Sequence, residues 1–340
     1  MRRGIVILAV VTVIVAAGQL AWADDERSSR PLRAGMIGLD TSHVIAFTKI
    51  INDPKASGDL AGLRIVAGYP GGTDIPDSRD RVERFTEQLR GMGVEIVDTI
   101  PALIAKVDVV LLESVDGRPH LEQARPVIEA GKPLFIDKPV AGSLADAVAI
   151  YELARQHGVP CFSSSSLRYT EGIQRLGEGD GIGEITGCAT WGPCSIQPEM
   201  PDLFWYGVHG VEMLFAVMGT GCESVVRAAT VDADLVTGVW KGGRIGTFRG
   251  IRKNEASFGA VVFGTKGIVK VDRSSGYEPL IREIARFFKT GIPPVSAEET
   301  IELFAFMEAA DESKRQGGAP VALESVLSKA RAAARAKLAK

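Results

Sequence analysis

Residues 35–44 read GMIGLDTSHV, an apolar strand end followed by Gly38 at the place where a first strand turns into a first helix. In a dinucleotide-binding turn of this kind, one glycine makes the bend and a second lets the backbone approach a pyrophosphate. A third lets the helix pack against the strand. Here only Gly38 remains, because Asp40 and His43 occupy the other two positions. The stretch predicts a strand–turn–helix unit with an altered phosphate loop.

Asp40 allows two interpretations. If its carboxylate faces the phosphates, two unit charges about 4 Å apart repel by roughly 4 kcal/mol at an effective dielectric near 20. Alternatively Asp40, Thr41 or Ser42 caps the helix VIAFTKII, and a side chain fills the anion site. Both remain open, and so does the choice between NAD and NADP. The candidate cofactor contacts in this turn are Gly38, Asp40, Thr41, Ser42 and His43.

From residue 32 to about 165, short apolar runs alternate with segments of helical period, which is typical of a parallel sheet covered by helices. The predicted strands are RAGMIGL, LRIVAGY, VEIVD, VDVVLLESV, PLFIDKP and VPCFSSS. Ser143 and Asp146 predict the start of the helix before the last strand, and Gly158 predicts its end. The fold class is therefore α/β, with an N-terminal Rossmann domain, a doubly wound parallel sheet, over residues 32–165.

After Leu167 the sequence becomes rich in predicted strands with glycine-bearing turns, as in GEITGCATWG and SFGAVVFGTKGIVKV. This pattern predicts a C-terminal α+β domain, residues 166–340, with an open, mainly antiparallel sheet. Two helices follow, YEPLIREIARFFKTG and AEETIELFAFMEAADESKRQGG, and we interpret the alanine-rich tail as a solvated terminal helix.

Residues 1–23 have the layout of a secretory signal: Arg2 and Arg3, an apolar stretch over 5–17, and Ala21-Trp22-Ala23 before an acidic segment. The apolar stretch is shorter than the roughly 20 residues that a spanning helix needs. We expect an exported protein, periplasmic or secreted, with no stable membrane span after cleavage. The choice between the general and the twin-arginine export route stays open.

Charge and cysteine content exclude some functions. The chain carries 39 basic and 42 acidic residues, and loss of two arginines with the signal would change the net charge from −3 to −5. No basic run predicts a nucleic-acid partner. The four cysteines have no paired spacing for zinc, and no metal site is predicted. Export would permit a pair between Cys188 and Cys194 or Cys222, but we expect buried free thiols.

FIDKPVAGSL, residues 135–144, places Asp137 and Lys138 at the carboxyl end of a predicted strand, where open α/β sheets bind their ligands. The lysine could donate a hydrogen bond and carry a proton for a substrate hydroxyl. It could also form an ion pair with Asp137 or another local acid. Its position at the strand end favours the functional role.

AGKPLFIDKP followed by SLADAVAIYELARQHGVP resembles the segment of the glucose-fructose oxidoreductase and inositol dehydrogenase family (Gfo/Idh/MocA) in which an E-K-P motif supplies the catalytic lysine. The resemblance extends from the first strand to FMEAADESKRQGG. It implies bound NAD or NADP and the oxidation or reduction of sugars and polyols. It also implies homo-oligomers formed through the C-terminal sheet.

The resemblance assigns roles to individual positions. Lys138 matches the catalytic lysine, and Asp137 stands for the usual glutamate. His209 in FWYGVHGVEMLF matches the acid–base histidine of a D-x-x-x-H segment, whose aspartate falls on Trp205. Glu212 lies one helical turn after His209 and could orient the imidazole, or form a structural ion pair instead.

Other positions complete the predicted site. His120 matches a family histidine at the start of the helix after the fourth strand, although a structural role is the commoner one. Arg168 matches an arginine after the sixth strand. The cofactor contacts predicted outside the first turn are Ser114, Asp116, Asp137 and Lys138. The predicted substrate contacts are Arg118, His120, Arg168, Trp205, Tyr206 and Glu212.

These observations predict an exported NAD(P)-dependent oxidoreductase with a small carbohydrate substrate. Two alternatives stay open. One is NAD-dependent glycoside cleavage without net redox change. The other is a non-catalytic carbohydrate-binding protein that keeps the two-domain shell with a closed phosphate loop.

Overall fold

The computed structural model describes residues 30–177, 181–254, 256–272 and 274–339. The predicted signal, residues 1–23, lies outside this part of the chain. The chain divides into two units, Met1–Pro31 and Leu32–Lys340. Every described helix and strand belongs to the second unit.

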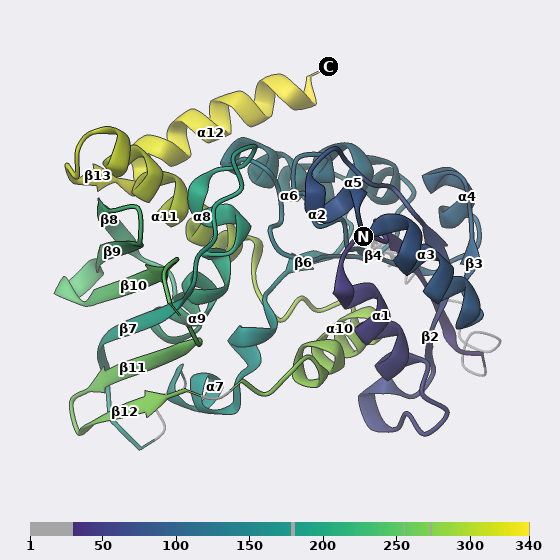
Figure 1. Cartoon of the computed structure of the whole chain (residues 1–340), viewed down its shortest axis with the longest axis horizontal. Coiled ribbons are helices and arrows are strands. Elements are labelled where there is room, and N and C mark those ends of the chain that lie inside the picture. The colour runs from purple at the N-terminus through teal and green to yellow at the C-terminus, as the bar shows by residue number, and fades with distance from the viewer. Residues whose placement is uncertain (1–29, 178–180, 255, 273, 340) are drawn as a thin grey trace, which may run out of the picture. The chain divides into compact units, whose positions relative to one another are not determined.

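The first sheet of this unit has six parallel strands in the order β3-β2-β1-β4-β5-β6 (Figure 1). Its strands are β1 Leu32–Ile37, β2 Leu63–Tyr69, β3 Glu95–Ile96, β4 Val109–Leu112, β5 Leu134–Ile136 and β6 Cys161–Ser163. All residues of β4, β5 and β6 are buried, as expected of strands covered on both faces. The strand order changes direction between β1 and β4, which is where doubly wound folds place their ligands.

Helices connect these strands. They are α1 Ser42–Ile51, α2 Pro76–Arg79, α3 Val82–Gly91, α4 Ile100–Ile104, α5 His120–Glu129 and α6 Leu144–His157, with the short turn η1 Gly58–Leu60 before β2. The predicted ends of α6 are confirmed. The Ser143 side chain accepts a hydrogen bond from the Asp146 backbone N–H at 3.1 Å, and Gly158 adopts the left-handed conformation at φ 65°.

The second sheet has the order β12-β11-β7-β10-β9-β8-β13. Its strands are β7 Ile185–Pro193, β8 Cys222–Ala229, β9 Ala233–Trp240, β10 Ile245–Ile251, β11 Gly259–Gly264, β12 Gly267–Val271 and β13 Val321–Ala322. Strands β7 and β10 pair in parallel, and the other neighbours are antiparallel. The predicted fold class, a parallel Rossmann sheet followed by a mainly antiparallel sheet, is confirmed.

The helices of the second half pack in two different places. They are η2 Ser166–Tyr169, α7 Glu171–Gly177, α8 Asp202–Trp205, α9 Val208–Met218, η3 Lys241–Gly243, α10 Glu278–Thr290, α11 Ala297–Arg315 and α12 Leu323–Leu338. Helices α9 and α11 pack against the second sheet. Helix α10 instead joins the apolar core of α1 and β1, where Ile281, Ile284 and Phe287 are fully buried.

The terminal helix α12 corrects an expectation, because it is not simply solvated. It packs along α6 and buries Val326, Leu327 and Ala330. Lys337 near its end forms an ion pair with Asp146 of α6 at 2.6 Å. Since α10 and α12 both return to the first sheet's helices, residues 32–340 form one compact unit, and the boundary at 165/166 stays a prediction.

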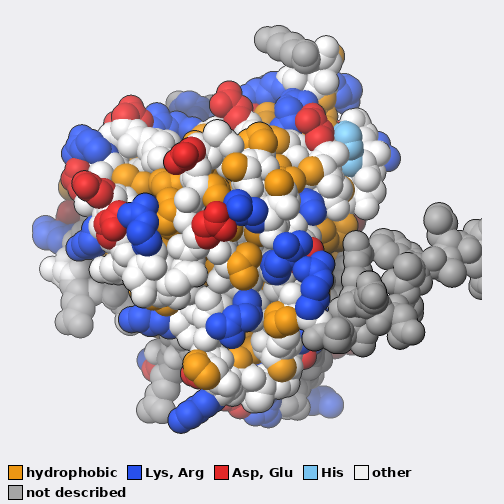
Figure 2. Space-filling model, turned by 90° about the vertical axis from the view of Figure 1, so that its right-hand side faces the viewer, with side chains coloured by type: hydrophobic (Ala, Val, Ile, Leu, Met, Phe, Trp, Pro, Cys, Tyr) orange, Lys and Arg blue, Asp and Glu red, His pale blue; other side chains and the backbone are white. Residues whose placement is uncertain are grey.

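The surface and the thiols add three facts. The side that carries the β3 edge of the first sheet shows basic and acidic side chains interspersed with small hydrophobic groups (Figure 2). The four cysteines are buried free thiols, as expected. Within the described residues, no helix combines the length and apolar character needed to cross a bilayer.

Candidate active site

A cavity of about 480 Å³ lies beside the carboxyl ends of β4 and β5. Its volume is within the range of about 300–1,000 Å³ that is usual for small-molecule sites. The first residues of α1, the strand-end Lys138, and Trp205, Tyr206 and His209 from α8, α9 and the turn between them all line it. The structure therefore brings the two predicted catalytic residues, Lys138 and His209, into one cavity.

Lys138 enters this cavity from the end of β5. Its Nζ lies 5.8 Å from the centre of the Tyr206 ring. In the described part of the chain it forms no ion pair, so the alternative of a salt bridge with Asp137 is not what the structure shows. Burial lowers the pKa of Lys138, while the charges of Asp137 and Glu113 oppose that shift. A partly desolvated ammonium near an aromatic ring suits contact with a substrate oxygen.

His209, in the first turn of α9, is held by a residue that the sequence analysis missed. The Ser165 hydroxyl lies 2.7 Å from His209 Nδ1. Nε2 has no hydrogen-bond partner among the described residues, which leaves it for a ligand. Burial, and then the charge of Lys138, lower the pKa of His209 well below its ordinary value, so the ring is neutral near neutral pH. The rings of Tyr206 and Phe258 stand edge-on to it, at 5.2 and 5.6 Å.

Glu212 does not orient His209. Its carboxylate accepts a hydrogen bond from Arg168 Nε at 2.7 Å, and Arg168 also pairs with Glu299 at 2.6 Å. Both acids raise the pKa of the buried Arg168 guanidinium against its desolvation. The structural ion pair, the second of the two alternatives for Glu212, is therefore the one that forms.

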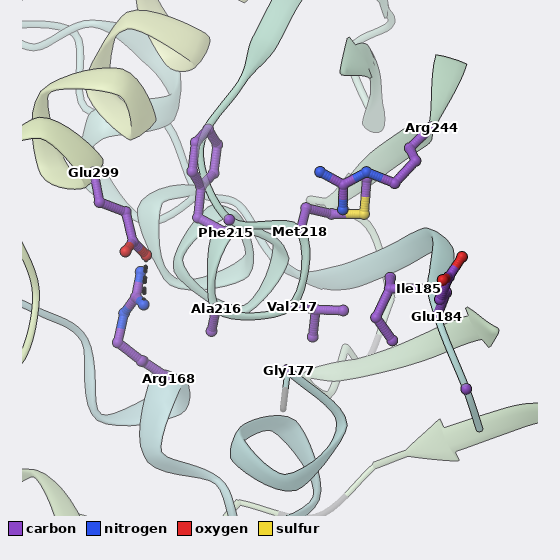
Figure 3. Close-up of a pocket in the computed structure, with 12 residues that line it drawn as sticks. Arg168, Gly177, Glu184, Ile185, Phe215, Ala216, Val217, Met218, Arg244 and Glu299 are labelled. Atoms are coloured by element: carbon purple, nitrogen blue, oxygen red, sulfur yellow. Dashed lines mark ion pairs between the residues drawn. The ribbon is translucent and has the colours of Figure 1, made fainter. Parts of the chain in front are cut away.

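A separate, more open depression of about 820 Å³ lies along α9, with the Arg168–Glu299 pair at one side (Figure 3). Apolar α9 side chains such as Val217 and Met218, and Arg244, which directly precedes β10, make up much of its lining. Neither Lys138 nor His209 lines it. Its carboxylates are Glu299, which is paired with Arg168, and Glu184, and it holds neither of the predicted catalytic residues, so this depression is the poorer candidate for chemistry.

Asp40 neither lines the cavity nor caps α1, and the expected helix cap is Thr41, one of the three candidates. It is fully buried, and its carboxylate accepts hydrogen bonds from the Ser78 hydroxyl at 2.6 Å and from the Val115 N–H at 2.9 Å. Burial raises the pKa of Asp40, while these hydrogen bonds oppose the shift. The side chain ties the β1–α1 turn to α2 and to the segment after β4.

Gly38 is required where it stands. Its φ is +83°, and an added Cβ would lie 2.1 Å from the Ser114 hydroxyl. Gly71, in the loop after β2, approaches Gly38 so closely that its own Cβ would lie 3.4 Å from Gly38 Cα. The loop after β2 therefore packs against the first glycine, and the cavity meets the turn further along, at Thr41, Ser42 and His43.

The start of α1 fits a phosphate. The Thr41 side chain caps the helix, accepting a hydrogen bond from the His43 N–H at 3.4 Å. Within the described residues, the N–H groups of Thr41 and Ser42 donate to no protein acceptor. Both residues line the cavity. Free N–H groups at a helix N-terminus form an anion site, so the altered turn still has donors for a nucleotide phosphate.

The residues predicted between β4 and α5 lie outside the cavity. The Ser114 hydroxyl donates to Gln123 at 2.9 Å, and Asp116 binds Arg118, which also pairs with Asp74. His120 is fully buried, with Nε2 2.9 Å from the Ser114 carbonyl oxygen and Nδ1 3.2 Å from the Val140 carbonyl oxygen. Of this segment Val115 lines the cavity.

The predicted ligand contacts therefore fall into two groups. The cavity receives Thr41, Ser42, His43, Lys138, Trp205, Tyr206 and His209. It does not receive Gly38, Asp40, Ser114, Asp116, Arg118, Asp137, His120, Arg168 or Glu212. For the second group, direct contact with a ligand stays a prediction, and their position outside the cavity argues against it.

The other lining residues were not among the predicted contacts: Asp77, Arg81, Val115, Ser166, Leu167, Phe258, Ser274, Gly276 and Tyr277. Phe258 precedes β11 and Tyr277 precedes α10, so both come from loops far from the recognised motifs. Ser165 and Ser166 belong to the run SSSS after β6, whose strand-end position was the available signal. Glu113, which directly follows β4, had the same signal as Asp137.

Comparison with known proteins identifies relatives. Residues 76–165 match the model of an oxidoreductase family with a NAD-binding Rossmann fold, Gfo/Idh/MocA. No curated protein matches the chain. A probable dehydrogenase from Thermotoga maritima shares 23% identity at a TM-score of 0.69, covering 87% of this chain and 100% of its own.

Two solved inositol dehydrogenases share the fold as well. The myo-inositol 2-dehydrogenase of Lactobacillus plantarum is 16% identical at a TM-score of 0.70, over 86% of this chain and 99% of its own. The scyllo-inositol dehydrogenase of Lactobacillus casei, solved with NAD(H) and scyllo-inositol, is 14% identical at 0.67, over 87% and 100%. At these identities the likeness establishes the fold.

Proposed function

We propose that the protein is a NAD(P)-dependent oxidoreductase acting on a sugar, polyol or sugar derivative, and the premise is the match of residues 76–165 to the Gfo/Idh/MocA oxidoreductase family model. One observation carries the proposal. Lys138 and His209 line the same cavity as Thr41 and Ser42, whose N–H groups donate to no acceptor within the described residues. A proton-transfer pair beside an anion site is what hydride transfer from an alcohol requires of the protein.

The two side chains divide the work on the substrate hydroxyl. His209 takes its proton through Nε2, because Ser165 holds Nδ1. Lys138 donates a hydrogen bond to the same oxygen and stabilises the negative charge that grows there as the proton leaves. Bound NAD(P) supplies the acceptor for the hydride that leaves the carbon, so the alcohol becomes a carbonyl. The Tyr206 and Phe258 rings beside His209 keep water from the imidazole.

Thr41 and Ser42 would hold the cofactor phosphates through their N–H groups, and Val115 would contact the cofactor near Lys138. The Asp40 side chain does not line the cavity, and Ser78 and Val115 donate hydrogen bonds to its carboxylate. The expected repulsion between this carboxylate and a pyrophosphate is thereby reduced.

The cavity wall supports a carbohydrate substrate. Tyr206, Phe258 and Tyr277 offer aromatic rings to the apolar face of a sugar ring, and Ser166 offers a hydroxyl to its polar edge. Inositol dehydrogenases are among the solved proteins that share the fold, which is consistent with a polyol.

Export and assembly are further parts of the proposal. The signal-like residues 1–23 support a periplasmic or secreted protein. Since free nicotinamide cofactors are scarce outside the cytoplasm, an exported enzyme would need to retain its cofactor tightly.

The second sheet supports a homo-oligomer. From the strand register, its face opposite α9 and α11 carries exposed apolar side chains: Val226, Leu235, Val239, Ile245, Phe263 and Ile268. A row of apolar side chains on an open sheet is typical of an interface. Light scattering of the purified chain tests this assembly, and a Leu235→Glu variant should shift it toward the monomer.

The test of activity is turnover by the full chain with NAD or NADP and a panel of inositols, sugars and sugar acids. Lys138→Met should lower kcat by about 10³-fold, within the range for loss of a proton-transfer or charge-stabilising group. Lys329→Met, at an exposed site on α12, is the matched control and should leave turnover unchanged. Equal turnover by wild type and Lys138→Met would remove the assignment.

Two other outcomes would redirect the proposal. Cleavage of a glycoside with no cofactor added would favour transient oxidation followed by elimination and re-reduction. Sugar binding by calorimetry, with no nucleotide bound under any condition, would favour a binding protein.

A further inference from the structure

Three side chains that could bind a metal ion converge beneath the cavity. His43 is the second residue of α1, Glu113 directly follows β4, and Asp137 directly follows β5. One nitrogen or oxygen atom from each lies within 4.8 Å of the others. The convergence follows from topology, because β1, β4 and β5 are parallel neighbours and their carboxyl ends share one edge of the sheet.

Buried carboxylate oxygens in this cluster have no partner. Glu113 is 0% exposed and Asp137 is 3% exposed. Both oxygens of Glu113, and Oδ1 of Asp137, accept no hydrogen bond within the described residues. The contact that does form is between His43 Nδ1 and Asp137 Oδ2, at 2.6 Å. Buried carboxylates normally find donors or cations, so the unpartnered oxygens of two buried acids in one cluster with an imidazole indicate a place for a cation.

The neighbouring positive charge does not supply that partner. Lys138 follows Asp137 in the chain, yet its Nζ lies over the Tyr206 ring, and it forms no ion pair with either acid in the described residues. Asp40, the next acid along the sheet edge, has its own donors in Ser78 and Val115. Among the described acids at this sheet edge, the oxygens without a partner are those of Glu113 and Asp137.

We propose that His43, Glu113 and Asp137 bind one divalent metal ion, of the Mn²⁺ or Zn²⁺ class. One imidazole nitrogen and two carboxylates form a mixed nitrogen–oxygen donor set, which suits these ions better than Ca²⁺, with its six to eight oxygen ligands, or Cu⁺, with its soft sulfur ligands. Two carboxylates match the charge of the ion. The ion would join α1 to the ends of β4 and β5 and place a fixed positive charge next to the cavity, which His43 lines. This site does not depend on the proposed redox function.

The test is direct titration of the chelator-treated full chain with MnCl₂ and, separately, ZnCl₂ by calorimetry, with melting temperature followed in parallel. The wild type should bind one equivalent of at least one of these ions and melt at a higher temperature when it is bound. Glu113→Gln, which keeps the shape and removes the charge, should weaken binding at least about tenfold. Glu129→Gln, at an exposed position on α5, is the matched control and should bind as the wild type does.

Three results overturn the proposal. A wild type that binds neither ion would mean that Glu113 and Asp137 share a proton instead. Full binding by Glu113→Gln would place the metal elsewhere, and so would equal loss in Glu129→Gln. If Glu113→Gln fails to fold, His43→Gln replaces it, with the same expected loss.

Discussion

The β1–α1 turn and the β4–β5 edge lie side by side on one sheet, and both bury acids where a ligand is expected. In the turn, Asp40 has a hydroxyl and an N–H as donors, both supplied by the protein. At the β4–β5 edge, formed by Glu113, Asp137 and Lys138, three carboxylate oxygens have no donor, and the lysine has no acid, among the residues that the structure describes. The acids at the two places are equally buried but differ in their hydrogen-bond partners. We therefore interpret Asp40, which has donors, as structural, and Glu113 and Asp137, which have open oxygens, as candidates for function.

This difference changes how the altered turn is understood. Replacement of the second glycine by Asp40 need not abolish an anion site, because the carboxylate has been drawn away into the fold. The N–H groups of Thr41 and Ser42 have no acceptor in the described part of the chain. We therefore expect ligand binding and catalysis at the polar groups that have no protein partner within the described residues.

The largest expected effect is at Asp40. Asp40→Ala would leave the Ser78 hydroxyl and the Val115 N–H without their acceptor, and should lower the free energy of unfolding by about 3 kcal/mol. Asp40→Asn keeps an acceptor for Val115 and should cost less. Chemical denaturation of the three proteins measures this. An Asp40→Ala protein as stable as the wild type would mean that the turn is not held by these bonds.

The next effect is at Ser165. Ser165→Ala removes the group that holds His209 Nδ1, so the imidazole should present Nε2 less often. We expect kcat to fall about tenfold, with little change in KM. Ser328→Ala, exposed on α12, provides the comparison. A change in KM alone would assign Ser165 to substrate binding rather than to orientation of His209.

A smaller effect concerns pH. Burial and Lys138 lower the pKa of His209, so the neutral form that accepts a proton persists below the ordinary imidazole pKa. On acidification, kcat for alcohol oxidation should therefore begin to decline only below pH ~6.5. A pH–rate profile of the wild type measures it. Loss of activity at or above that pH would contradict a desolvated His209.

The smallest expected effect is on the stability of a Glu113 variant, for comparison with Asp40→Ala. In chelator, Glu113→Gln should leave the free energy of unfolding within about 0.5 kcal/mol of the wild type or raise it, because no protein donor loses its acceptor. Chemical denaturation in the same chelator buffer gives the value. A loss as large as that of Asp40→Ala would show that Glu113 has a structural partner.

The local sequence pattern was enough to predict much of the fold and part of the candidate site. Strand ends and glycine turns predicted both sheets, and strand-end position together with the family resemblance predicted Lys138 and His209. The partners of Asp40 could not be read in this way, since Ser78 and Val115 lie 38 and 75 residues away along the chain. Such pairings depend on how loops cross at the sheet edge.

Two further misses have the same physical origin. Ser165 appeared as one of four serines, and only the packing of α9 against η2 selects it as the partner of His209. Helix α12 has a mostly polar sequence, and its small buried face became apparent only from its contact with α6. In both cases tertiary contact, rather than local preference, decides the outcome.

The central claim is that the altered turn still leaves the cleft able to bind a dinucleotide. The direct measurement is to denature the purified full chain, separate any released nucleotide by chromatography, and titrate the nucleotide-free protein with NAD and with NADP by calorimetry. We predict about one bound nucleotide per chain, either released or titrated. A chain that releases none and binds neither would contradict the claim.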